Sequence, residues 1–312
     1  MSHSNGAAGM LRRQLAADDI IVAPGCFNAM GARMIERVGF NTIYVSGYGI
    51  SVNHVGRPDV GLATLTEMTD VAGKIASAVN IPVICDADTG YGNAINVMRT
   101  VEEFIKSGVS GIHLEDQVAP KRCGHVAGKQ VISLEEAAGK IRAAARVRDD
   151  TDPDFVLIAR CDARGVAGGS LDDAISRCQA YAEAGADVVF PEGLLSAEEI
   201  GAVCDAVPGG VLYNRTGVSP NISSEGLQEL GVDIVINPGG AMRAAANAMW
   251  DYYAAFAEED EALEDRLKAA NQAHPLADFH SFAGFGEIRE MEAEFLPEEE
   301  AAKYEGAVGF QP

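Results

Sequence analysis

The sequence predicts an α/β protein built as a (β/α)₈ barrel of the TIM type with a C-terminal helical extension. Two observations favour this fold class: eight short runs of apolar, often β-branched residues recur along the chain, and an amphipathic stretch follows each run. Runs that are apolar on both faces are typical of parallel strands covered by helices. Eight βα units of roughly 30 residues fill about 250 residues, so a chain of 312 residues accommodates the whole barrel.

The eight apolar runs are the predicted strands. They lie at residues 20–23, 42–46, 82–86, 111–115, 155–160, 187–190, 211–214 and 233–236. Residues 96–106 illustrate the helical pattern between them, with Val97, Val101 and Phe104 on one face. Glycines stand at the joints between a helix and the next strand, where a left-handed residue ends a helix; they are Gly39, Gly108, Gly185 and Gly231. This repeated unit favours a closed barrel over a doubly wound open sheet.

The chain divides into two regions by composition. Residues 1–250 contain the eight units and form the expected catalytic barrel, whereas residues 251–312 carry sixteen acidic and four basic residues. A helical pattern over 251–270 is followed by an aromatic segment that begins at Phe279. We expect this acidic extension to pack on the barrel or on a neighbouring subunit.

Charge and composition exclude several function classes. A formal net charge of −22 repels nucleic-acid phosphates and anionic membrane surfaces, so neither is an expected partner. The first twenty residues lack the apolar core of a signal peptide, no run of about 18 apolar residues occurs, and the six cysteines show no CxxC spacing. We therefore expect a cytoplasmic protein with reduced thiols. The acidic, lysine-poor composition resembles that of proteins from salt-loving organisms, which predicts a halophilic host.

Two connections between the predicted elements are too long for simple turns. Residues 47–65 follow the second strand and residues 116–132 follow the fourth. Connections of this length in a compact domain are usually binding loops or lids. Because barrel enzymes carry their chemistry at the carboxyl ends of the strands, we expect both connections to border the functional site.

Three carboxylates follow neighbouring strands at this end of the predicted barrel: Asp86, Asp88 and Glu115. In a partly desolvated site they would repel one another, and a hard divalent cation would keep all three ionised. The sequence therefore predicts a Mg²⁺ site, with Mn²⁺ as the alternative. Because magnesium keeps several waters, some of these carboxylates are expected to hold water and not the metal itself. A polar turn without a metal is the alternative interpretation of Asp86 to Gly90.

The long connection after the fourth strand contains a thiol flanked by cations, in Lys121-Arg122-Cys123-Gly124-His125. Neighbouring positive charges favour a thiolate, and a glycine lets the backbone approach a ligand closely. Such a cysteine can act as a general acid or base. The alternative is a basic loop with an incidental thiol.

An arginine at the end of the fifth predicted strand, Arg160, could bind a substrate carboxylate through both of its terminal nitrogens. Asn214 and Thr216 could complete that pocket. The alternative is an internal ion pair of Arg160 with Glu192 or Asp162, and the two roles are compatible.

Three motifs follow one another along the chain: Asp-Ala-Asp-Thr-Gly-Tyr-Gly at 86–92, His-Leu-Glu-Asp-Gln at 113–117 and Lys-Arg-Cys-Gly-His at 121–125. In this succession the chain, from about Ala23 to Arg243, resembles the isocitrate lyase and phosphoenolpyruvate mutase superfamily. It is most similar to the methylisocitrate lyase and isocitrate lyase branches. The resemblance implies a (β/α)₈ barrel in a homotetramer whose C-terminal helix is swapped between subunits.

The implied activity is a retro-aldol cleavage of a 2-hydroxy tricarboxylate, isocitrate or 2-methylisocitrate, into succinate and glyoxylate or pyruvate. The resemblance implies a Mg²⁺ ion near Asp86, Asp88 and Glu115, and a loop that closes over the substrate and protonates the carbanion through Cys123. The implied catalytic residues are Cys123, His125, Tyr44 and Arg160. The implied substrate-binding residues are Ser46, Gly47, Asp59, Lys121, Arg122, Gly124, Glu192, Asn214 and Thr216.

The branch within the superfamily stays open, because the motifs point in different directions. Phe190 before Pro191-Glu192 resembles methylisocitrate lyases, which serve propionate breakdown, and Tyr213-Asn214 resembles isocitrate lyases, which serve the glyoxylate bypass. Ser46-Gly47-Tyr48 resembles the branch of dimethylmalate lyases and oxaloacetate hydrolases. A phosphoenolpyruvate mutase-type enzyme is a further alternative, weakened by the Cys-Gly-His loop. A non-catalytic carboxylate-binding protein is the least favoured.

Overall fold

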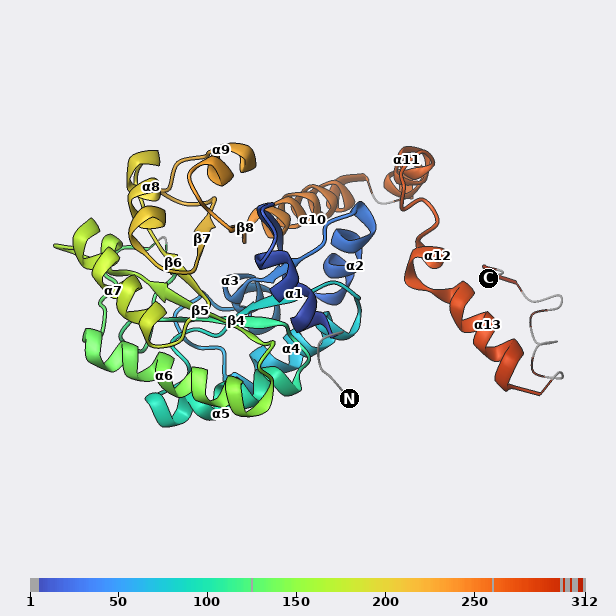
Figure 1. The fold of residues 1–312 in the computed structure, drawn as a ribbon. Coiled ribbons are helices and arrows are strands. Elements are labelled where there is room, and N and C mark those ends of the chain that lie inside the picture. Colours follow the sequence, from blue (N-terminus) through green and yellow to red (C-terminus); the bar gives the residue numbers. More distant parts are fainter. Residues whose placement is uncertain are drawn as a thin grey trace. The chain divides into compact units, whose positions relative to one another are not determined.

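The computed structural model describes residues 6–124, 126–259, 261–297, 300, 304 and 308–310. Parallel strands close into a barrel in the order of the chain (Figure 1). They are β1 (Ile21–Cys26), β2 (Ile43–Val45), β3 (Val83–Asp86), β4 (Gly111–Glu115), β5 (Val156–Cys161), β6 (Val188–Pro191), β7 (Gly210–Asn214) and β8 (Ile234–Asn237). Pairing of β1 with β8 closes the sheet. The predicted fold class is confirmed, and each predicted apolar run overlaps one strand.

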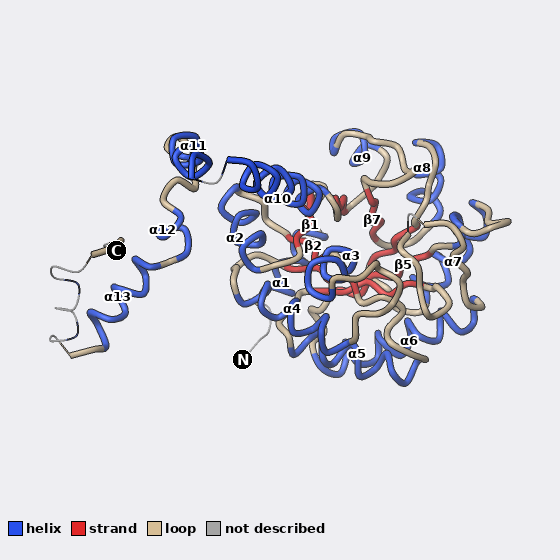
Figure 2. The backbone as a smooth tube through the Cα atoms, turned by 180° about the vertical axis from the view of Figure 1, so that it is seen from behind, coloured by secondary structure: helices blue, strands red, loops and turns tan. Residues whose placement is uncertain are grey.

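An outer layer of helices surrounds the strands (Figure 2). It is formed by α2 (Ala29–Val38), α4 (Leu65–Ser77), α5 (Ala94–Lys106), α6 (Leu134–Thr151), α7 (Leu171–Glu183), α8 (Ala197–Ala206) and α9 (Ser224–Glu229). A further helix, α1 (Ala7–Leu15), precedes β1. Arg12 of α1 donates hydrogen bonds to the backbone carbonyls of Asp154 and Phe155 at the start of β5. This helix therefore covers the amino-terminal end of the barrel, opposite the end where chemistry is expected.

The core lies in two apolar clusters. Ile84, Ile158, Leu212 and Ile234 are fully buried in one cluster with Leu11 of α1. The other cluster joins the strands to the outer helices, and it includes the face predicted for residues 96–106, since Val97, Val101 and Phe104 are fully buried. Burial on both faces explains why the strands are nearly continuous apolar runs.

The glycines predicted to end helices adopt the left-handed conformation that a side chain disfavours. Their φ angles are +106° at Gly39, +84° at Gly108, +109° at Gly185 and +91° at Gly231. Each directly precedes the turn into the next strand. These four predictions are confirmed.

Neither long connection is a plain loop. Residues 47–65 contain the short helix α3 (Gly47–Ile50) and the π-helical turn η2 (Ser51–Val55). In residues 116–132, Gln117 and Val131 form an antiparallel bridge that ties the two ends of the connection together. Both segments are therefore held close to the strand ends from which they start.

The chain separates into two compact units, Met1–Ala245 and Ala246–Pro312. The second unit contains most of α10 (Gly240–Glu259), followed by α11 (Glu261–Asn271), α12 (Phe279–Ala283) and α13 (Phe285–Phe295). The helical pattern of residues 251–270 is thus divided between α10 and α11. In the part of the chain that is described, no helix combines the length and the apolar character needed to span a bilayer.

Candidate active site

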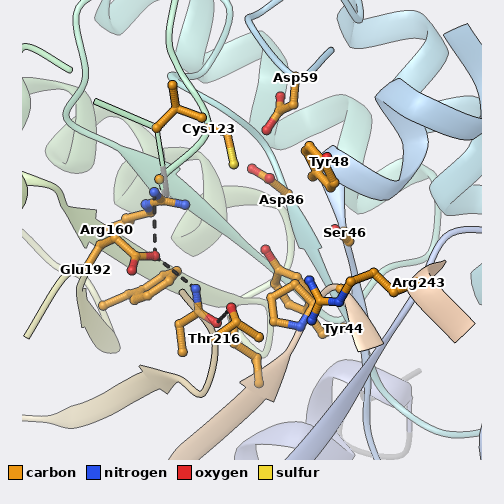
Figure 3. Close-up of a pocket in the computed structure, with 17 residues that line it drawn as sticks. Tyr44, Ser46, Tyr48, Asp59, Asp86, Cys123, Arg160, Glu192, Thr216 and Arg243 are labelled. Atoms are coloured by element: carbon orange, nitrogen blue, oxygen red, sulfur yellow. Dashed lines mark hydrogen bonds and ion pairs between the residues drawn. The ribbon is translucent and has the colours of Figure 1, made fainter. Parts of the chain in front are cut away.

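A pocket of about 250 Å³ opens at the carboxyl ends of the strands (Figure 3). It is lined by Tyr44, Ser46, Tyr48, Asp59, Asp86, Cys123, Gly124, Val126, Arg160, Phe190, Glu192, Asn214, Thr216, Ile236, Pro238, Gly239 and Arg243. The residues come from all strands of the barrel except β1, or from the segments that come after those strands. This is the end of the barrel at which the fold carries its chemistry.

The pocket brings together most of the residues that the sequence nominated. Those that line it are Tyr44, Ser46, Asp59, Asp86, Cys123, Gly124, Arg160, Glu192, Asn214 and Thr216. Gly47, Asp88, Glu115, Lys121 and Arg122 are not part of the lining. His125 lies outside the described residues.

Gly47 lies directly against one carboxylate of the pocket. A Cβ atom at position 47 would lie 2.4 Å from Asp86 Oδ2, so any larger residue would displace that side chain. On the other side, the Asp88 backbone N–H donates a hydrogen bond to Asp86 Oδ1 at 3.0 Å. The carboxylate of Asp86 is therefore fixed in place by backbone, and it is 5% exposed at the floor of the pocket.

Lys121 is buried outside the lining of the pocket, where its ammonium contacts two carboxylates. Its Nζ lies 2.6 Å from Asp59 Oδ1 and 2.7 Å from Asp88 Oδ1. Burial raises the pKa of Asp88 to about 6, and the Lys121 ammonium works against that shift. The sequence suggested that the positive charge of Lys121 acts on Cys123, but this charge instead balances two carboxylates, one of which, Asp59, lines the pocket.

Arg160 forms the densest charge cluster of the site. Its guanidinium donates to both Asp162 oxygens, at 2.9 and 3.1 Å, and lies 3.4 Å from Glu115 Oε2 and 3.6 Å from Glu192 Oε2. Burial by itself would lower the pKa of Arg160, but these three carboxylates raise it well above its ordinary value. The internal ion pair that the sequence suggested is therefore present, while the side chain still lines the pocket.

A chain of polar contacts extends from Glu192 across the pocket. Asn214 Nδ2 donates to Glu192 Oε2 at 3.0 Å, and Thr216 Oγ1 donates to Asn214 Oδ1 at 2.6 Å (Figure 3). Each of these three side chains is oriented by a hydrogen bond to its neighbour in the row. A ligand in the pocket would therefore meet these groups in fixed directions.

Tyr44 and His113 form a buried pair beside Asp86. The Tyr44 hydroxyl and His113 Nε2 are 2.7 Å apart, and the two rings are stacked with centroids 5.8 Å apart. Burial lowers the pKa of His113 to about 4, so the imidazole is neutral at pH 7. Burial also raises the pKa of Tyr44 well above its ordinary value, and the hydroxyl stays protonated. The buried histidine therefore orients the Tyr44 side chain through the hydrogen bond between them.

The backbone at Gly124 comes so close to Arg160 that only glycine fits. A Cβ atom there would lie 2.3 Å from Arg160 Nη2. Cys123 precedes it, and its sulfur points toward Asp86 (Figure 3). The thiol and the guanidinium consequently face the same cavity from neighbouring positions.

Comparison with known proteins identifies the family of this chain. A family model described as phosphoenolpyruvate phosphomutase matches residues 11–257. The chain belongs to the phosphoenolpyruvate mutase and isocitrate lyase superfamily. It is 42% identical to a 2,3-dimethylmalate lyase of Eubacterium barkeri, over 91% of this chain and 96% of that protein. It is also 39% identical to a 2-methylisocitrate lyase of Aeropyrum pernix (95% and 94% covered) and 35% identical to an isocitrate lyase of Haloferax volcanii (94% and 88% covered).

Solved structures of the superfamily have the same fold. A crystal structure of 2,3-dimethylmalate lyase matches with a TM-score of 0.85 at 34% identity, covering 98% of this chain and 99% of the other. A phosphonopyruvate hydrolase in complex with oxalate and Mg²⁺ matches with a TM-score of 0.81 at 30% identity, covering 94% and 100%. The resemblance seen in the sequence is confirmed, and the protein is an enzyme of this superfamily of lyases and mutases.

Members of the superfamily use Mg²⁺, and the residues of this chain fit that ion when some contacts pass through water. Both carboxylate oxygens of Glu115 are buried without a hydrogen-bond partner. Burial raises the pKa of this carboxyl well above its ordinary value, Arg160 and Lys121 oppose that shift, and a bound cation would favour the ionised form further. Among the described residues no three His, Cys, Asp or Glu side chains are close enough to ligate one ion directly. Hard oxygen donors at this spacing suit magnesium, which keeps several of its waters.

Several pocket residues were not nominated from the sequence. Val126 directly follows the 121–125 motif, Ile236 and Gly239 belong to a segment with no polar signal, and Arg243 follows β8 by six residues in the first turn of α10. Tyr48 and Phe190 stand beside nominated residues, so their position after a strand was an available signal. Arg243 could be found only from the fold, because nothing in the local sequence distinguishes it from an ordinary helix arginine.

Proposed function

We propose that this enzyme is a Mg²⁺-dependent carbon–carbon lyase that cleaves a 2-hydroxy tricarboxylate, isocitrate or 2-methylisocitrate, into succinate and a 2-oxo acid. The observation that carries the proposal is that one pocket contains a thiol together with two groups that can bind carboxylates, the proposed metal site at Asp86 and an arginine. Cys123, Asp86 and Arg160 line one part of it, and Arg243 lies on the side away from Arg160 (Figure 3). A substrate with carboxylates at its ends and a hydroxyl between them matches this distribution.

Polar groups with fixed positions bind the substrate. Ser46 and the backbone at Gly47 lie beside Asp86, and the chain from Arg160 to Thr216 lies across the pocket. Tyr44 is held by His113 at 2.7 Å and orients the substrate hydroxyl. Because these groups are already in place before the substrate binds, little ordering entropy is lost on binding.

Mg²⁺ bound near Asp86, Asp88 and Glu115 would neutralise the negative charge that develops on the substrate oxygens. In the cleavage itself, the hydroxyl proton passes to a basic group of the pocket, and the oxygen electrons form the new C=O bond of the 2-oxo acid. The C2–C3 bond breaks, and its electron pair moves onto C3 and into the adjoining carboxylate. The Cys123 thiol then donates its proton to C3, which completes succinate.

The surroundings of Cys123 support its role as an acid. Its sulfur points toward Asp86, and the nearest lysine in the sequence, Lys121, is paired with Asp59 and Asp88. Protonation of the carbanion at C3 requires that this thiol carries its proton at that step.

A dicarboxylate is the second candidate substrate, because a 2,3-dimethylmalate lyase is among the most similar relatives. 2-Methylisocitrate and 2,3-dimethylmalate differ only at C3, where the first carries a carboxymethyl group and the second a methyl group. An oxaloacetate-cleaving or phosphoenolpyruvate mutase-type activity would retain the barrel and the metal. A carboxylate-binding protein without catalysis is the least favoured, since the thiol and the carboxylates of the pocket are all present.

Turnover of matched substrates tests the proposal. Release of 2-oxo acid from isocitrate, 2-methylisocitrate and 2,3-dimethylmalate, and release of oxalate from oxaloacetate, are followed with purified enzyme, Mg²⁺ and KCl, with EDTA as the control. We expect EDTA-sensitive cleavage of a tricarboxylate, and loss of at least about a thousandfold in turnover for Cys123→Ser. Preference for either dicarboxylate would replace the proposed substrate. Wild-type turnover by Cys123→Ser would remove the thiol from the mechanism.

We also propose that the enzyme is a homotetramer, in which residues 251–312 pack on a neighbouring subunit. Large apolar side chains are exposed in the C-terminal unit, including Trp250 at 76%, Tyr253 at 64% and Phe295 at 71%. An exposed apolar set of this kind typically marks a protein–protein interface. Multi-angle light scattering of the full chain and of a chain ending at residue 245 tests this, and a monomeric full chain would contradict it.

A further inference from the structure

The three residues around the thiol, 122–124, are held from two sides by buried side chains of the barrel. On the first side is Gln117, which follows β4 and is 1% exposed. Its Nε2 donates to the Arg122 carbonyl at 3.0 Å, and its Oε1 accepts from the Arg122 N–H at 2.9 Å. The side-chain amide thus pairs with the backbone of residue 122 as a neighbouring strand would.

On the second side is Lys129, which is 7% exposed. Its Nζ donates to the Gly124 carbonyl at 2.7 Å and to Asp162 Oδ1 at 2.8 Å. A buried ammonium without such acceptors would be costly. The Gly124 carbonyl can satisfy Lys129 only while residues 122–124 lie where they are, so the lysine favours that position of the backbone.

Asp162 connects this lysine to the substrate pocket. It is fully buried, and the carboxylate that accepts from Lys129 also accepts two hydrogen bonds from Arg160, at 2.9 and 3.1 Å. Its own backbone N–H is held by Asp116 Oδ1 at 2.8 Å. One carboxylate therefore fixes both the arginine of the pocket and, through Lys129, the backbone beside the thiol.

We propose that Lys129 is a positioning residue, which through Asp162 sets the thiol of Cys123 in register with the Arg160 guanidinium. The inference rests on the proposed role of Cys123 as the acid. Lys129 does not line the pocket, so it acts through the backbone of Gly124 and not through the substrate. Gln117 holds the other end of the same three residues.

Native-state alkylation of the cysteines tests the proposal without any substrate. Iodoacetamide labelling is quantified by peptide mass spectrometry at Cys123 and at Cys204, a partly buried cysteine of α8 outside the pocket that serves as an internal reference. Lys129→Met removes the ammonium and retains a flexible side chain. Lys74→Met is the matched control, since Lys74 is 66% exposed on α4.

We expect Lys129→Met to raise the labelling rate of Cys123 by about tenfold or more, with no change at Cys204 and no change at either site in Lys74→Met. Unchanged labelling of Cys123 in Lys129→Met would overturn the proposal. If Cys204 rises in parallel, the fold has loosened as a whole, and Lys129→Gln, whose uncharged side chain is one atom too short to contact both the Gly124 carbonyl and Asp162, is measured in its place. A Cys123 rate equal to wild type in Lys129→Gln would likewise overturn it.

The kinetic readout separates positioning from binding. With the best substrate, Lys129→Met should lower kcat by about ten- to a hundredfold and change KM by less than about threefold, because the loss falls on the protonation step. Wild-type kcat in Lys129→Met would overturn the proposal. If wild-type enzyme cleaves none of the substrates, the proposed function fails by itself, and the labelling difference still decides the position of residues 122–124.

Discussion

The two walls of the pocket differ in how their charges are balanced. On the wall formed by β3 to β6, Arg160 is the cation that the described residues contribute to the lining, and it pairs with Asp162; Lys121, outside the lining, pairs with Asp59 and Asp88. On the wall formed by β7, β8 and the start of α10, Arg243 is the only charged side chain that the described part of the chain contributes to the lining. Its guanidinium is exposed and forms no hydrogen bond or ion pair with the described residues.

This difference indicates two tasks. The cations of the first wall are paired before any ligand arrives, so its groups are preorganised for chemistry. The second wall has an uncompensated positive charge on the side of the pocket away from Glu192 (Figure 3). A substrate carboxylate that reaches this side would supply the missing partner. Changes in the first wall should therefore affect catalysis and stability, and changes in the second should affect the choice of substrate.

The largest effect is expected for Asp86→Asn. The substitution removes one negative charge from the proposed Mg²⁺ site and keeps the shape of the side chain, so we expect turnover to fall by about a thousandfold or more. Asp70→Asn on the exposed surface of α4 is the matched control. Mg²⁺ titration of activity and of intrinsic fluorescence is the measurement. Retention of more than about a tenth of the activity would show that the first wall does not carry the metal.

Asp162→Asn should destabilise the fold, because it leaves Arg160 and Lys129 buried beside a neutral amide. Breaking a buried ion pair in this way costs about 3–5 kcal/mol. Burial alone would raise the pKa of Asp162, but Arg160 and Lys129 hold it well below the ordinary value of 3.8. A lowered pKa stabilises the fold above pH 3.8, and that contribution is lost as the pH falls below it. Urea unfolding at pH 7 and at pH 3 should therefore show a smaller wild-type advantage at pH 3; an equal advantage would contradict it.

Arg243→Gln tests the second wall. We expect KM for 2-methylisocitrate to rise by about tenfold, since the third carboxylate loses its cation, while KM for 2,3-dimethylmalate changes by less than about threefold. Arg99→Gln removes an equally exposed charge from α5, outside the pocket, and should change neither value. An equal rise in KM for both substrates would show that Arg243 attracts anionic substrates in general and does not bind the third carboxylate.

The smallest expected effect is that of salt on thermal stability, which should be felt by exposed charges and not by buried ones. Because the net charge is −22, KCl should screen the repulsion between surface charges. Raising KCl from about 0.1 to about 1 M should increase the melting temperature of the wild type by roughly a few degrees. The destabilisation caused by Asp162→Asn should not change, because that carboxylate is fully buried. Differential scanning calorimetry measures both. A melting temperature independent of KCl would argue against adaptation of the acidic surface to salt.

The strands and the helix caps could be predicted because their causes are local. An apolar run such as residues 82–86 is apolar for burial on both faces, and Gly185 stands where the backbone needs a left-handed residue. The nominated site residues could likewise be found, because in a barrel every strand delivers its last residues to the same end. The polar residues just after a strand are therefore recognisable in the sequence even when their partners are not.

The partners of those residues could not be predicted. Lys121 stands two positions from Cys123 in the chain, yet its ammonium lies between Asp59 and Asp88. Lys129 carried no signal, and Gln117 stood out only as the last residue of the 113–117 motif, because a lysine or glutamine on a polar loop is ordinarily exposed. Their burial against residues 122–124 depends on how the loop folds back over β4 and β5.

By itself, the sequence determined the class of fold, the end of the barrel that carries the site and the superfamily, since each of these depends on local pattern and on motifs of fixed composition. The tertiary structure alone decided which charges balance one another and which, like Arg243, stay available to a ligand. The physical reason is that Coulomb and hydrogen-bond energies depend on distance and burial. Both quantities are set by contacts between residues far apart in the chain, such as Lys129 and Asp162.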